Sequence, residues 1–506
     1  MPLDASRADL TLAVVGAGVM GRGIAQLFAR AGIRVLLHDA RAGAADEARR
    51  EAARQFDRLA EKGRMTREQA GRAAACIELA GALAQIAPAH GVVEAIVESL
   101  DAKRALFREL EAVVAEDCVL ATNTSSLSVT AIASACRRPE RAAGFHFFNP
   151  VPLMKVVEVV DGLATAPWVG DALAAIAERC GHRAVRAQDT PGFIVNHAGR
   201  GYGTEALRIA GEGIAGFHRI DRILRESAGF RMGPFELLDL TGLDVSHPVM
   251  ESIYRQYYEE PRYRPSPITA QRLAAGALGR KSARGFYAYA DGKAEAVPSE
   301  PAPAARPARV WISRSGAGMK LGELLAKLGA PLDPNPRPAA QSLCLVAPLG
   351  QDATTTAIEE GLDPRRTLAV DCLLPLDKHR TLMTTPVTSP TMREAAHGLL
   401  GADGVPVSVI RDSPGFVAQR VLATIVNIAC DIAQQRIAAP ADIDAGVTLG
   451  LGYPQGPLAW GDALGPATLL RILDAMHAFY GDPRYRASPW LKRRALLGVS
   501  LLTPEA

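Results

Sequence analysis

The sequence predicts a doubly wound α/β domain, then an all-helical domain, and then a degenerate second copy of both. Three observations predict this architecture. A glycine-rich turn joins a buried strand to a helix near the N-terminus, strand-like and helical patterns alternate up to about residue 188, and motifs of the first half recur in the second. A chain of 506 residues is also too long for a single core, because one domain holds roughly 100–200 residues.

The first element is a strand–helix–strand unit. Leu10–Val15 is a short apolar, β-branched run that leads into G-A-G-V-M-G and then into apolar residues at helical spacing. Gly32 ends that helix, and Ile33–Leu37 is a second buried run that ends at Asp39. This order is typical of a parallel sheet.

The following elements continue the alternation and then lose it. Residues 44–80 are rich in Ala, Arg and Glu and are expected to form a helical hairpin, with further strands at 91–97, 119–121 and 142–147. Helical patterns dominate from Asp189 to Leu278, and Asp291–Arg309 is a linker rich in Pro and Ala. The predicted segments are an α/β domain at 1–188, a helical domain at 189–290, the linker at 291–309, a degenerate α/β domain at 310–410 and a second helical domain at 411–506.

An internal duplication accounts for the second half. T-P-G-F-I-V-N at 190–196 recurs as S-P-G-F-V-A-Q at 413–419, and a G-P…D motif recurs as well. The offset is the same each time, since 414 − 191, 457 − 234 and 462 − 239 all give 223. Separate motifs that keep one register indicate a repeat rather than chance.

Composition narrows the class of protein. A net charge of +3 gives no support for nucleic acid or a membrane surface as a partner. The seven cysteines are scattered, contain no C-x-x-C and are typical of free thiols rather than of a disulfide framework or a metal site. The N-terminus shows no secretory signal, and no apolar run is long enough to cross a bilayer. We therefore expect a cytoplasmic protein without a metal.

The glycine-rich turn carries the first chemical prediction. Its G-x-G-x-x-G pattern lies between a strand and a helix, so that a pyrophosphate can approach the backbone at the positive helix N-terminus. Asp39 closes the second strand, where an acidic side chain binds ribose hydroxyls and repels a 2′-phosphate. The sequence thus predicts a Rossmann-type domain that binds NAD rather than NADP. The predicted cofactor-binding residues here are Gly16, Gly18, Val19, Met20, Gly21 and Asp39.

A histidine and a glutamate carry the second chemical prediction. His146 lies in G-F-H-F-F-N-P, and Glu158 follows after the break at Pro150. If the second strand folds back beside the first, the two side chains meet as a base and its orienting partner. Such a pair is suited to taking a proton from an alcohol. A lone histidine between phenylalanines is more often a packing residue, so the pair requires the rest of the chain for support.

Further motifs link these two predictions. G-A-G-V-M-G-R-G-I-A-Q, V-V-E-A-I-V-E-S-L, N-T-S-S-L, G-F-H-F-F-N-P-V-P-L-M-K-V-V-E and T-P-G-F-I-V-N occur in this order within residues 10–290. Together they resemble the L-3-hydroxyacyl-CoA dehydrogenase family. The two-copy length is similar to that of bacterial 3-hydroxybutyryl-CoA and 3-hydroxyadipyl-CoA dehydrogenases, including the phenylacetate-degradation type. The resemblance implies NAD-dependent oxidation of an L-3-hydroxyacyl-CoA to the 3-oxoacyl-CoA.

The resemblance also implies catalytic roles. His146 is the implied general base, and Glu158 binds its other ring nitrogen. Ser125 is implied to hydrogen-bond the reacting oxygen, and Asn196 to align His146 and the substrate. Each residue has a structural alternative: Ser125 could cap a helix, Glu158 could be a surface strand residue, and Asn196 could brace two helices.

Further residues are implied to bind the cofactor and the substrate. Glu98, Lys103 and Asn149 lie where the family contacts the cofactor, although Glu98 and Lys103 could also form a solvated helix pair. The helical hairpin is implied to hold the CoA end of an acyl-CoA. Lys62 and Arg64 are the candidates for its phosphates.

The second half keeps the fold signals and loses the chemistry. Ser313–Lys320 lacks the glycine spacing of a dinucleotide loop. Aligning the prolines at 150 and 375, and using the 223 offset for the later motif, pairs His146 with Asp371, Glu158 with Met383 and Asn196 with Gln419. We therefore expect one active site per chain. The two helical repeats are expected to pack together as a pseudo-dimer within one chain, which leaves further association into a homo-oligomer open.

Two other functions remain open at this point. One is a dehydrogenase of a non-CoA 3-hydroxy acid, as in L-gulonate dehydrogenase relatives. The other is a non-catalytic NAD-binding scaffold. The chain length and the duplicated tail favour the CoA substrate, and the intact set of polar site residues argues against a scaffold.

Overall fold

The computed structural model describes residues 3–298, 300–315 and 317–505. They form two compact units. The first comprises the chain up to His197 together with Gln435–Leu451, and the second comprises Ala198–Gln434 and Gly452–Glu505. Gly316, within the predicted degenerate loop, lies outside the described residues. The predicted domain boundaries stay predictions, and the grouping of Gln435–Leu451 with the first unit is a feature that they do not contain.

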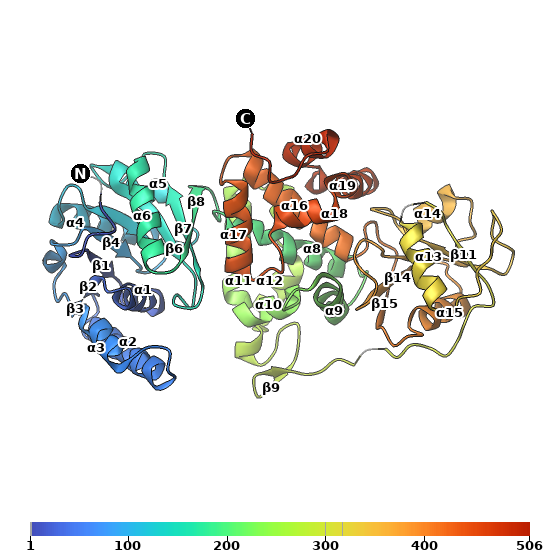
Figure 1. Cartoon of the computed structure of the whole chain (residues 1–506), viewed down its shortest axis with the longest axis horizontal. Helices are drawn as coiled ribbons and strands as arrows, with labels where there is room; N and C mark the ends of the chain where they lie inside the picture. Colours follow the sequence, from blue (N-terminus) through green and yellow to red (C-terminus); the bar gives the residue numbers. More distant parts are fainter. Residues whose placement is uncertain (1–2, 299, 316, 506) are drawn as a thin grey trace. The chain divides into compact units, whose positions relative to one another are not determined.

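The first unit is built on an eight-stranded sheet in the order β3-β2-β1-β4-β5-β6-β7-β8 (Figure 1). Neighbouring strands pair parallel except for β6 and β7, which pair antiparallel, so that β7 and β8 run opposite to the other six strands. The strands are β1 (Thr11–Val15), β2 (Arg34–His38), β3 (Ile77–Leu79), β4 (Gly91–Glu94), β5 (Val119–Thr122), β6 (Ala142–Phe147), β7 (Val156–Asp161) and β8 (Arg183–Gln188). The doubly wound domain predicted from the sequence is thereby confirmed.

Helices cover both faces of this sheet. One apolar core joins it to α1, α2, α3 and α6, and a second core joins the other face to α4, α5 and η1. Thr66 starts α3 with a capping box in which Thr66 and Gln69 bind each other's backbone amides, and this fixes the turn of the predicted hairpin. The helices are α1 (Val19–Arg30), α2 (Ala44–Glu61), α3 (Arg67–Ala75), α4 (Leu100–Val113), α5 (Val129–Ala133), α6 (Pro167–Arg179) and α7 (Val195–Ala198), with 3₁₀ helices η1 (Leu83–Ile86) and η2 (Pro139–Arg141).

A helix from the far end of the chain completes the first unit. α17 (Pro440–Leu451) packs against β7 and β8. Gln188 at the end of β8 donates its amide to the carbonyl of Ile437 at 2.8 Å. Gly446 and Gly450 face Val195 so closely that an added Cβ would lie 3.6 and 3.0 Å from its methyl groups. Glycine at these positions therefore allows close packing of the helix.

The second unit contains the remaining helices of both repeats. α8 (Arg200–Gly211) packs along α16 (Ala418–Gln434), and Gly201 lets the backbones approach Ile425 and Ile428. The other helices of these repeats are α9 (Phe217–Ala228), α10 (Pro234–Thr241), α11 (Leu243–Gln256), α12 (Pro267–Ala274), α18 (Pro457–Leu464), α19 (Pro466–Tyr480) and α20 (Pro489–Leu497), with η3 (Pro261–Tyr263), η4 (Arg280–Ser282), η5 (Pro483–Tyr485) and the short hairpin of β9 (Tyr289–Ala290) and β10 (Lys293–Ala294).

A smaller α/β layer completes the second unit. Five strands follow the order β11-β12-β13-β14-β15, and only β13 and β14 pair antiparallel. The elements are β11 (Val310–Ile312), α13 (Gly318–Lys327), β12 (Leu343–Val346), α14 (Ala353–Glu359), β13 (Thr367–Val370), β14 (Arg380–Thr384), α15 (Pro390–Leu400) and β15 (Val407–Ile410). This is the degenerate second copy that the sequence predicts.

Strand register corrects one predicted correspondence between the copies. His146 pairs with Glu158 across β6 and β7. In the second copy, the amide of Asp371 bonds to the carbonyl of Thr381, whereas Met383 pairs with Ala369. The prediction that Met383 matches Glu158 is therefore wrong, and Thr381 holds that position. The reason is that the connection between these strands is two residues shorter in the second copy. The offset between matching residues is therefore 225 at Asp371 but 223 at Thr381.

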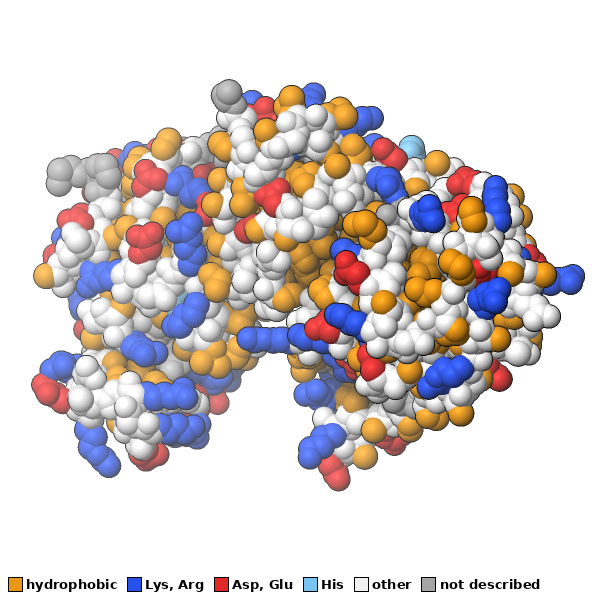
Figure 2. Space-filling view, turned by 45° about the vertical axis from the view of Figure 1, so that its right-hand side comes forward, with side chains coloured by type: hydrophobic (Ala, Val, Ile, Leu, Met, Phe, Trp, Pro, Cys, Tyr) orange, Lys and Arg blue, Asp and Glu red, His pale blue; other side chains and the backbone are white. Residues whose placement is uncertain are grey.

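On the face seen in Figure 2, Lys and Arg side chains are interspersed with Asp, Glu and apolar side chains. Among the described residues, no helix has the length and apolarity required to cross a membrane.

Candidate active site

The glycine-rich loop has the backbone geometry of a phosphate-binding turn. Gly16 adopts a φ of 103°, and a Cβ there would lie 2.5 Å from the carbonyl oxygen of Ala95. A Cβ on Gly21 would lie 1.7 Å from the carbonyl oxygen of Gly16. Gly18, in contrast, has nothing within 4 Å of its Cβ position. The outer glycines therefore allow the tight turn, and the middle one leaves space in which a ligand can approach the backbone.

The loop ends at the open N-terminus of α1. Gly18 is its N-cap residue, no side chain caps the helix and no acidic residue lies in the first turn. Asp39 accepts a hydrogen bond from the amide of Ala17 at 2.7 Å, which joins the strand-end carboxylate to the loop. These features fit a dinucleotide, because its pyrophosphate needs free amides and its ribose needs an acceptor. Val19 and Met20 begin the helix itself, and Val19 is exposed.

His146 and Glu158 meet on neighbouring antiparallel strands. Nδ1 of His146 lies 2.6 Å from Oε2 of Glu158, and the two side chains are 6% and 0% exposed. The imidazole packs against the rings of Phe148 and Phe193, with centroids 4.5 and 5.9 Å away. Within the described chain, no hydrogen-bond partner is found for Nε2 of His146, so this nitrogen can accept a proton from a substrate.

The other oxygen of Glu158 is fixed by the backbone that enters α7. Oε1 accepts the amides of Ile194 and Val195 at 2.9 and 2.8 Å. Phe193 reaches this geometry with a φ of 49°. The carboxylate is thus held from two sides, and the alternative that Glu158 is a surface strand residue is excluded by its burial.

Ser125 and Asn196 also contact each other. Nδ2 of Asn196 donates to the carbonyl oxygen of Ser125 at 3.4 Å. Glu98 organises the same loop, since its Oε1 accepts the amide of Ser125 at 2.9 Å and the hydroxyl of Thr124 at 2.8 Å. Ser125 is not a helix cap, because Ser128 caps α5. Burial raises the pKa of Glu98, but Lys103 and the loop donors outweigh it and leave that pKa below its ordinary value.

Lys103 supports this loop from inside the protein. Its side chain is 1% exposed, and Nζ lies 2.6 Å from Glu94 and 3.4 Å from Glu98. Glu94 is fully buried and accepts the hydroxyl of Thr122 at 2.7 Å. The alternative of a solvated pair therefore fails for Lys103. Glu94 is not among the residues predicted from the sequence, although a glutamate inside an apolar strand run was the available signal.

A cavity of about 480 Å³ lies beside α1 and the helical hairpin. Arg64 and Asn149 line it, together with Arg22, Arg30 and Lys155. Lys62 is exposed at the hairpin tip and is not one of the lining residues. The predicted substrate and cofactor contacts of these residues stay predictions.

The matching position of the second copy is filled by protein. Gln419 is buried and donates through Nε2 to Asp371 at 2.9 Å and to the carbonyl of Pro348 at 3.2 Å. Its Oε1 accepts the amide of Gly350 at 2.8 Å. Thr381 stands where the first copy has Glu158, so no base and acid pair exists at this position.

Comparison with known proteins finds two matching family models. A family model described as the 3-hydroxyacyl-CoA dehydrogenase NAD-binding domain matches residues 11–190, and one described as the C-terminal domain matches residues 192–289 and 415–500. The chain belongs to the 3-hydroxyacyl-CoA dehydrogenase family. As a family member it is an NAD-dependent dehydrogenase, and the second match confirms that the helical domain is duplicated.

Relatives of both lengths occur in this dehydrogenase family. The 3-hydroxyadipyl-CoA dehydrogenase of Escherichia coli is 37% identical over 96% of this chain and 98% of its own. A crystal structure of 3-hydroxybutyryl-CoA dehydrogenase from Escherichia coli has a TM-score of 0.87 and 36% identity, and covers 96% of this chain and 98% of that one. The probable 3-hydroxybutyryl-CoA dehydrogenase of Bacillus subtilis is 39% identical over 54% of this chain and 96% of its own, as expected for a single-copy protein.

Proposed function

We propose that this chain oxidises the 3-hydroxyl group of an L-3-hydroxyacyl-CoA to the 3-oxoacyl-CoA, with His146 as the general base and Glu158 as its partner. The observation that supports the proposal is the buried contact between these side chains at 2.6 Å. The hydroxyl proton must leave as the carbon loses hydride, and an imidazole is a suitable base near neutral pH.

Glu158 sets the direction in which the imidazole works. A hydrogen on Nδ1 points at the carboxylate, so Nε2 is the nitrogen left to accept the substrate proton. After proton transfer, the nearby carboxylate stabilises the imidazolium. The amides of Ile194 and Val195 keep that carboxylate from rotating away.

Ser125 and Asn196 are proposed to stabilise the reacting oxygen. Each carries a donor, and donors fixed in advance are most effective where negative charge develops. The hydrogen bond from Asn196 to the Ser125 backbone supports a shared position, and Glu98 holds the loop. NAD, when bound at Gly16–Gly21 and Asp39, supplies the hydride acceptor. Glu98, Lys103 and Asn149 are proposed to shape the cofactor side, Lys103 through Glu98.

Measuring NADH-linked reduction of acetoacetyl-CoA tests the catalytic proposal. His146→Gln is expected to lower kcat by about 10²- to 10⁴-fold, because general base catalysis contributes that much. His477→Gln is a matched control at an exposed position of α19. Equal rates for the wild type and His146→Gln would reject the assignment of His146 as the base. Offering 3-hydroxybutyrate without CoA as the substrate tests the non-CoA alternative.

The cavity beside α1 is proposed to take the phosphates of CoA. Four basic side chains and one carboxylate line it, and the carboxylate, that of Glu51, is already paired with Arg54. Arg64 brings the hairpin into the same wall. Arg64→Ala should raise KM for acetoacetyl-CoA about tenfold and leave the KM for acetoacetyl-pantetheine unchanged, because the shorter thioester lacks the nucleotide. Lys62→Ala tests the other hairpin residue. An equal KM increase for both thioesters would contradict a role in phosphate binding.

The acyl group is proposed to be short or dicarboxylic, in line with the substrates in the names of the Escherichia coli relatives. Comparing kcat/KM for 3-hydroxybutyryl-, 3-hydroxyadipyl- and 3-hydroxyhexadecanoyl-CoA tests this. A preference for the long chain would reject it.

The contact between α8 and α16 is proposed to act as a pseudo-dimer interface within one chain. Arg420 of α16 is fully buried and contacts Glu205 of α8 at 2.8 Å. Because α16 of the same chain already covers α8, a second chain is not expected to bind there. The mass that light scattering gives should therefore not include a dimer formed through α8.

The seven cysteines are free thiols, which supports a reducing, cytoplasmic location.

A further inference from the structure

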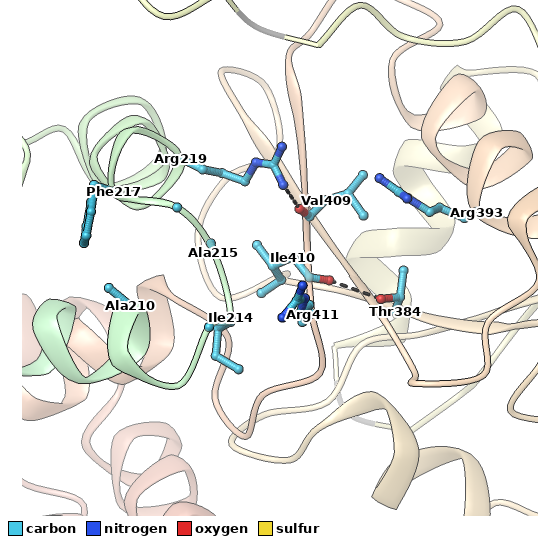
Figure 3. A pocket seen from close by; sticks show the side chains of 12 residues that line it. Ala210, Ile214, Ala215, Phe217, Arg219, Thr384, Arg393, Val409, Ile410 and Arg411 are labelled. Carbon is cyan, nitrogen blue, oxygen red and sulfur yellow. Dashed lines mark hydrogen bonds between the residues drawn. The ribbon is translucent and has the colours of Figure 1, made fainter. Parts of the chain in front are cut away.

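A cavity in the second unit is lined by three arginines. It has a volume of about 600 Å³, within the range of small-molecule sites, and lies where the start of α9 meets β14, α15 and β15. Arg219, Arg393 and Arg411 line it, and no lining residue is acidic. Figure 3 shows Arg219 and Arg393 extending from opposite sides toward Val409, with Arg411 below them.

The charges at this cavity are incompletely paired. Arg219 donates to the carbonyl of Val409 at 2.6 Å and lies 2.7 Å from the half-exposed Glu300. Among the described residues, no hydrogen-bond or ion-pair partner is found for the guanidinium of Arg393 or of Arg411. Like charges that face one space repel each other, so this arrangement becomes favourable when an anion enters.

The first copy provides an internal reference for the same location. The amide of Arg411 bonds to the carbonyl of Ile214 at 3.0 Å, and the amide of Gln188 bonds to the carbonyl of Ile437 at 2.8 Å. These two bonds correspond, since 411 − 188 and 437 − 214 both give 223. The cavity therefore has a counterpart in the first unit, where α17 packs on β7 and β8.

That counterpart is neutralised by its own side chains. Arg186 lies 2.9 Å from Asp161 and 2.6 Å from Asp171. Its guanidinium also occupies the space above Gly170, where an added Cβ would lie 2.1 Å from it. Asp442 accepts the amide of Arg186 at 3.2 Å. The guanidinium of Arg186 therefore fills this space in the first copy, and carboxylates balance its charge, so no room is left for an anion.

The second copy changes most of these features. At the constant offset Asp161 becomes a threonine, Asp442 becomes an arginine and the filling guanidinium becomes a valine, whereas Asp171 stays acidic as Glu394, which does not line the cavity. The matched pairs are Asp161 with Thr384, Gly170 with Arg393, Arg186 with Val409, Gln188 with Arg411 and Asp442 with Arg219. Three independent positions have gained an arginine around a space that the first copy fills.

We propose that this cavity binds a phosphate-bearing organic anion, and that the degenerate half provides a ligand site separate from catalysis. Guanidinium groups bind phosphate oxygens through paired N–H donors. Gly216 starts α9 without a side-chain cap at the same wall, which adds amide donors. Ile214, Phe217 and Ile410 give the cavity an apolar wall, which suits a nucleotide better than inorganic phosphate.

Hydrogen–deuterium exchange of the full chain tests the proposal locally. Pyrophosphate, ADP and CoA are the probes, and protection is expected in residues 213–219 and 408–411. Arg393→Ala/Arg411→Ala should weaken the binding that causes this protection by about tenfold or more. The matched control Arg365→Ala/Arg493→Ala removes two exposed arginines that do not line the cavity.

The outcomes separate this site from the catalytic one. Reduction of acetoacetyl-CoA should be unchanged in the Arg393/Arg411 variant without added anion, whatever the result for His146. Protection by ADP and CoA beyond that by pyrophosphate supports a nucleotide, and protection by CoA alone narrows the ligand to the CoA nucleotide. No protection by any probe, or equal protection in both double variants, would overturn the proposal.

Discussion

Oε2 of Glu158 lies 2.6 Å from Nδ1 of His146, while Oε1 of the same carboxylate binds two backbone amides. One side chain therefore joins the strand that carries the histidine to the segment that leads into Asn196. This contact stabilises a buried carboxylate inside the sheet, because each of its oxygens has a hydrogen-bond partner.

Replacing Glu158 by Gln should disrupt the histidine without a large change in volume. Gln can still accept the amides, but it can present its NH₂ to Nδ1 and stabilise the wrong tautomer. We expect kcat to fall about 10²- to 10⁴-fold with little change in KM, as for other orienting carboxylates. Steady-state kinetics with acetoacetyl-CoA and NADH check this, and a melting curve like that of the wild type shows that folding is intact. Unchanged kcat would contradict the orienting role.

Asp39 should determine the choice of cofactor. Its carboxylate lies at the end of β2 and binds the loop amide of Ala17. Asp39→Ser removes the charge that repels a 2′-phosphate, so the ratio of kcat/KM for NAD over NADP should fall by about tenfold or more. Asp46→Ser, in the first turn of α2, is the matched control. If the ratio stays at the wild-type value, Asp39 does not select the cofactor.

The sequence was sufficient for elements defined by local chemistry. The glycine pattern and the strand-end Asp39 predict a dinucleotide-binding loop, and in the structure Asp39 accepts the amide of Ala17 in that loop. The repeated T-P-G-F and S-P-G-F turns predict matched geometry. Phe193 and Phe416 indeed have φ values of 49° and 51°. Such features depend on a few adjacent residues and therefore survive in the sequence pattern.

Other features depend on distant parts of the chain. No local pattern at Gln435–Leu451 indicates that α17 packs on β7 and β8, because its apolar positions fit any sheet face. Thr381 rather than Met383 holds the position of Glu158 because a two-residue deletion lies in a loop, and loop lengths do not fix strand register by themselves. The burial of Lys103 could not be predicted from an amphipathic helix pattern, which usually leaves lysine exposed.

Lys103 and Glu94 should behave as a unit. Lys103→Met leaves the buried Glu94 carboxylate without its ammonium partner, and breaking a buried ion pair costs about 3–5 kcal/mol of unfolding free energy. The double variant Glu94→Gln/Lys103→Met should be less destabilised than Lys103→Met alone, because no uncompensated charge remains. Denaturant unfolding of the four proteins in this cycle measures the difference. Additive losses would show that the two residues act separately.

Asp371 should destabilise the folded protein near neutral pH, because burial disfavours its charged form. Burial raises the pKa of this carboxyl from 3.8 to about 6, although Gln419 partly opposes that change. Because the folded state binds the proton more tightly than the unfolded state, stability falls as pH rises from about 4 to 6 and is constant above that range.

Asp371→Asn removes this dependence and keeps an oxygen that can accept from Gln419. We expect the variant to be more stable than the wild type above pH 6 by up to about 3 kcal/mol, with the gain vanishing toward pH 4. Urea unfolding at several pH values measures the gain, and acetoacetyl-CoA reduction should be unchanged. A variant that is less stable at pH 7, or one whose gain does not depend on pH, would show that the charged carboxylate contributes to the fold.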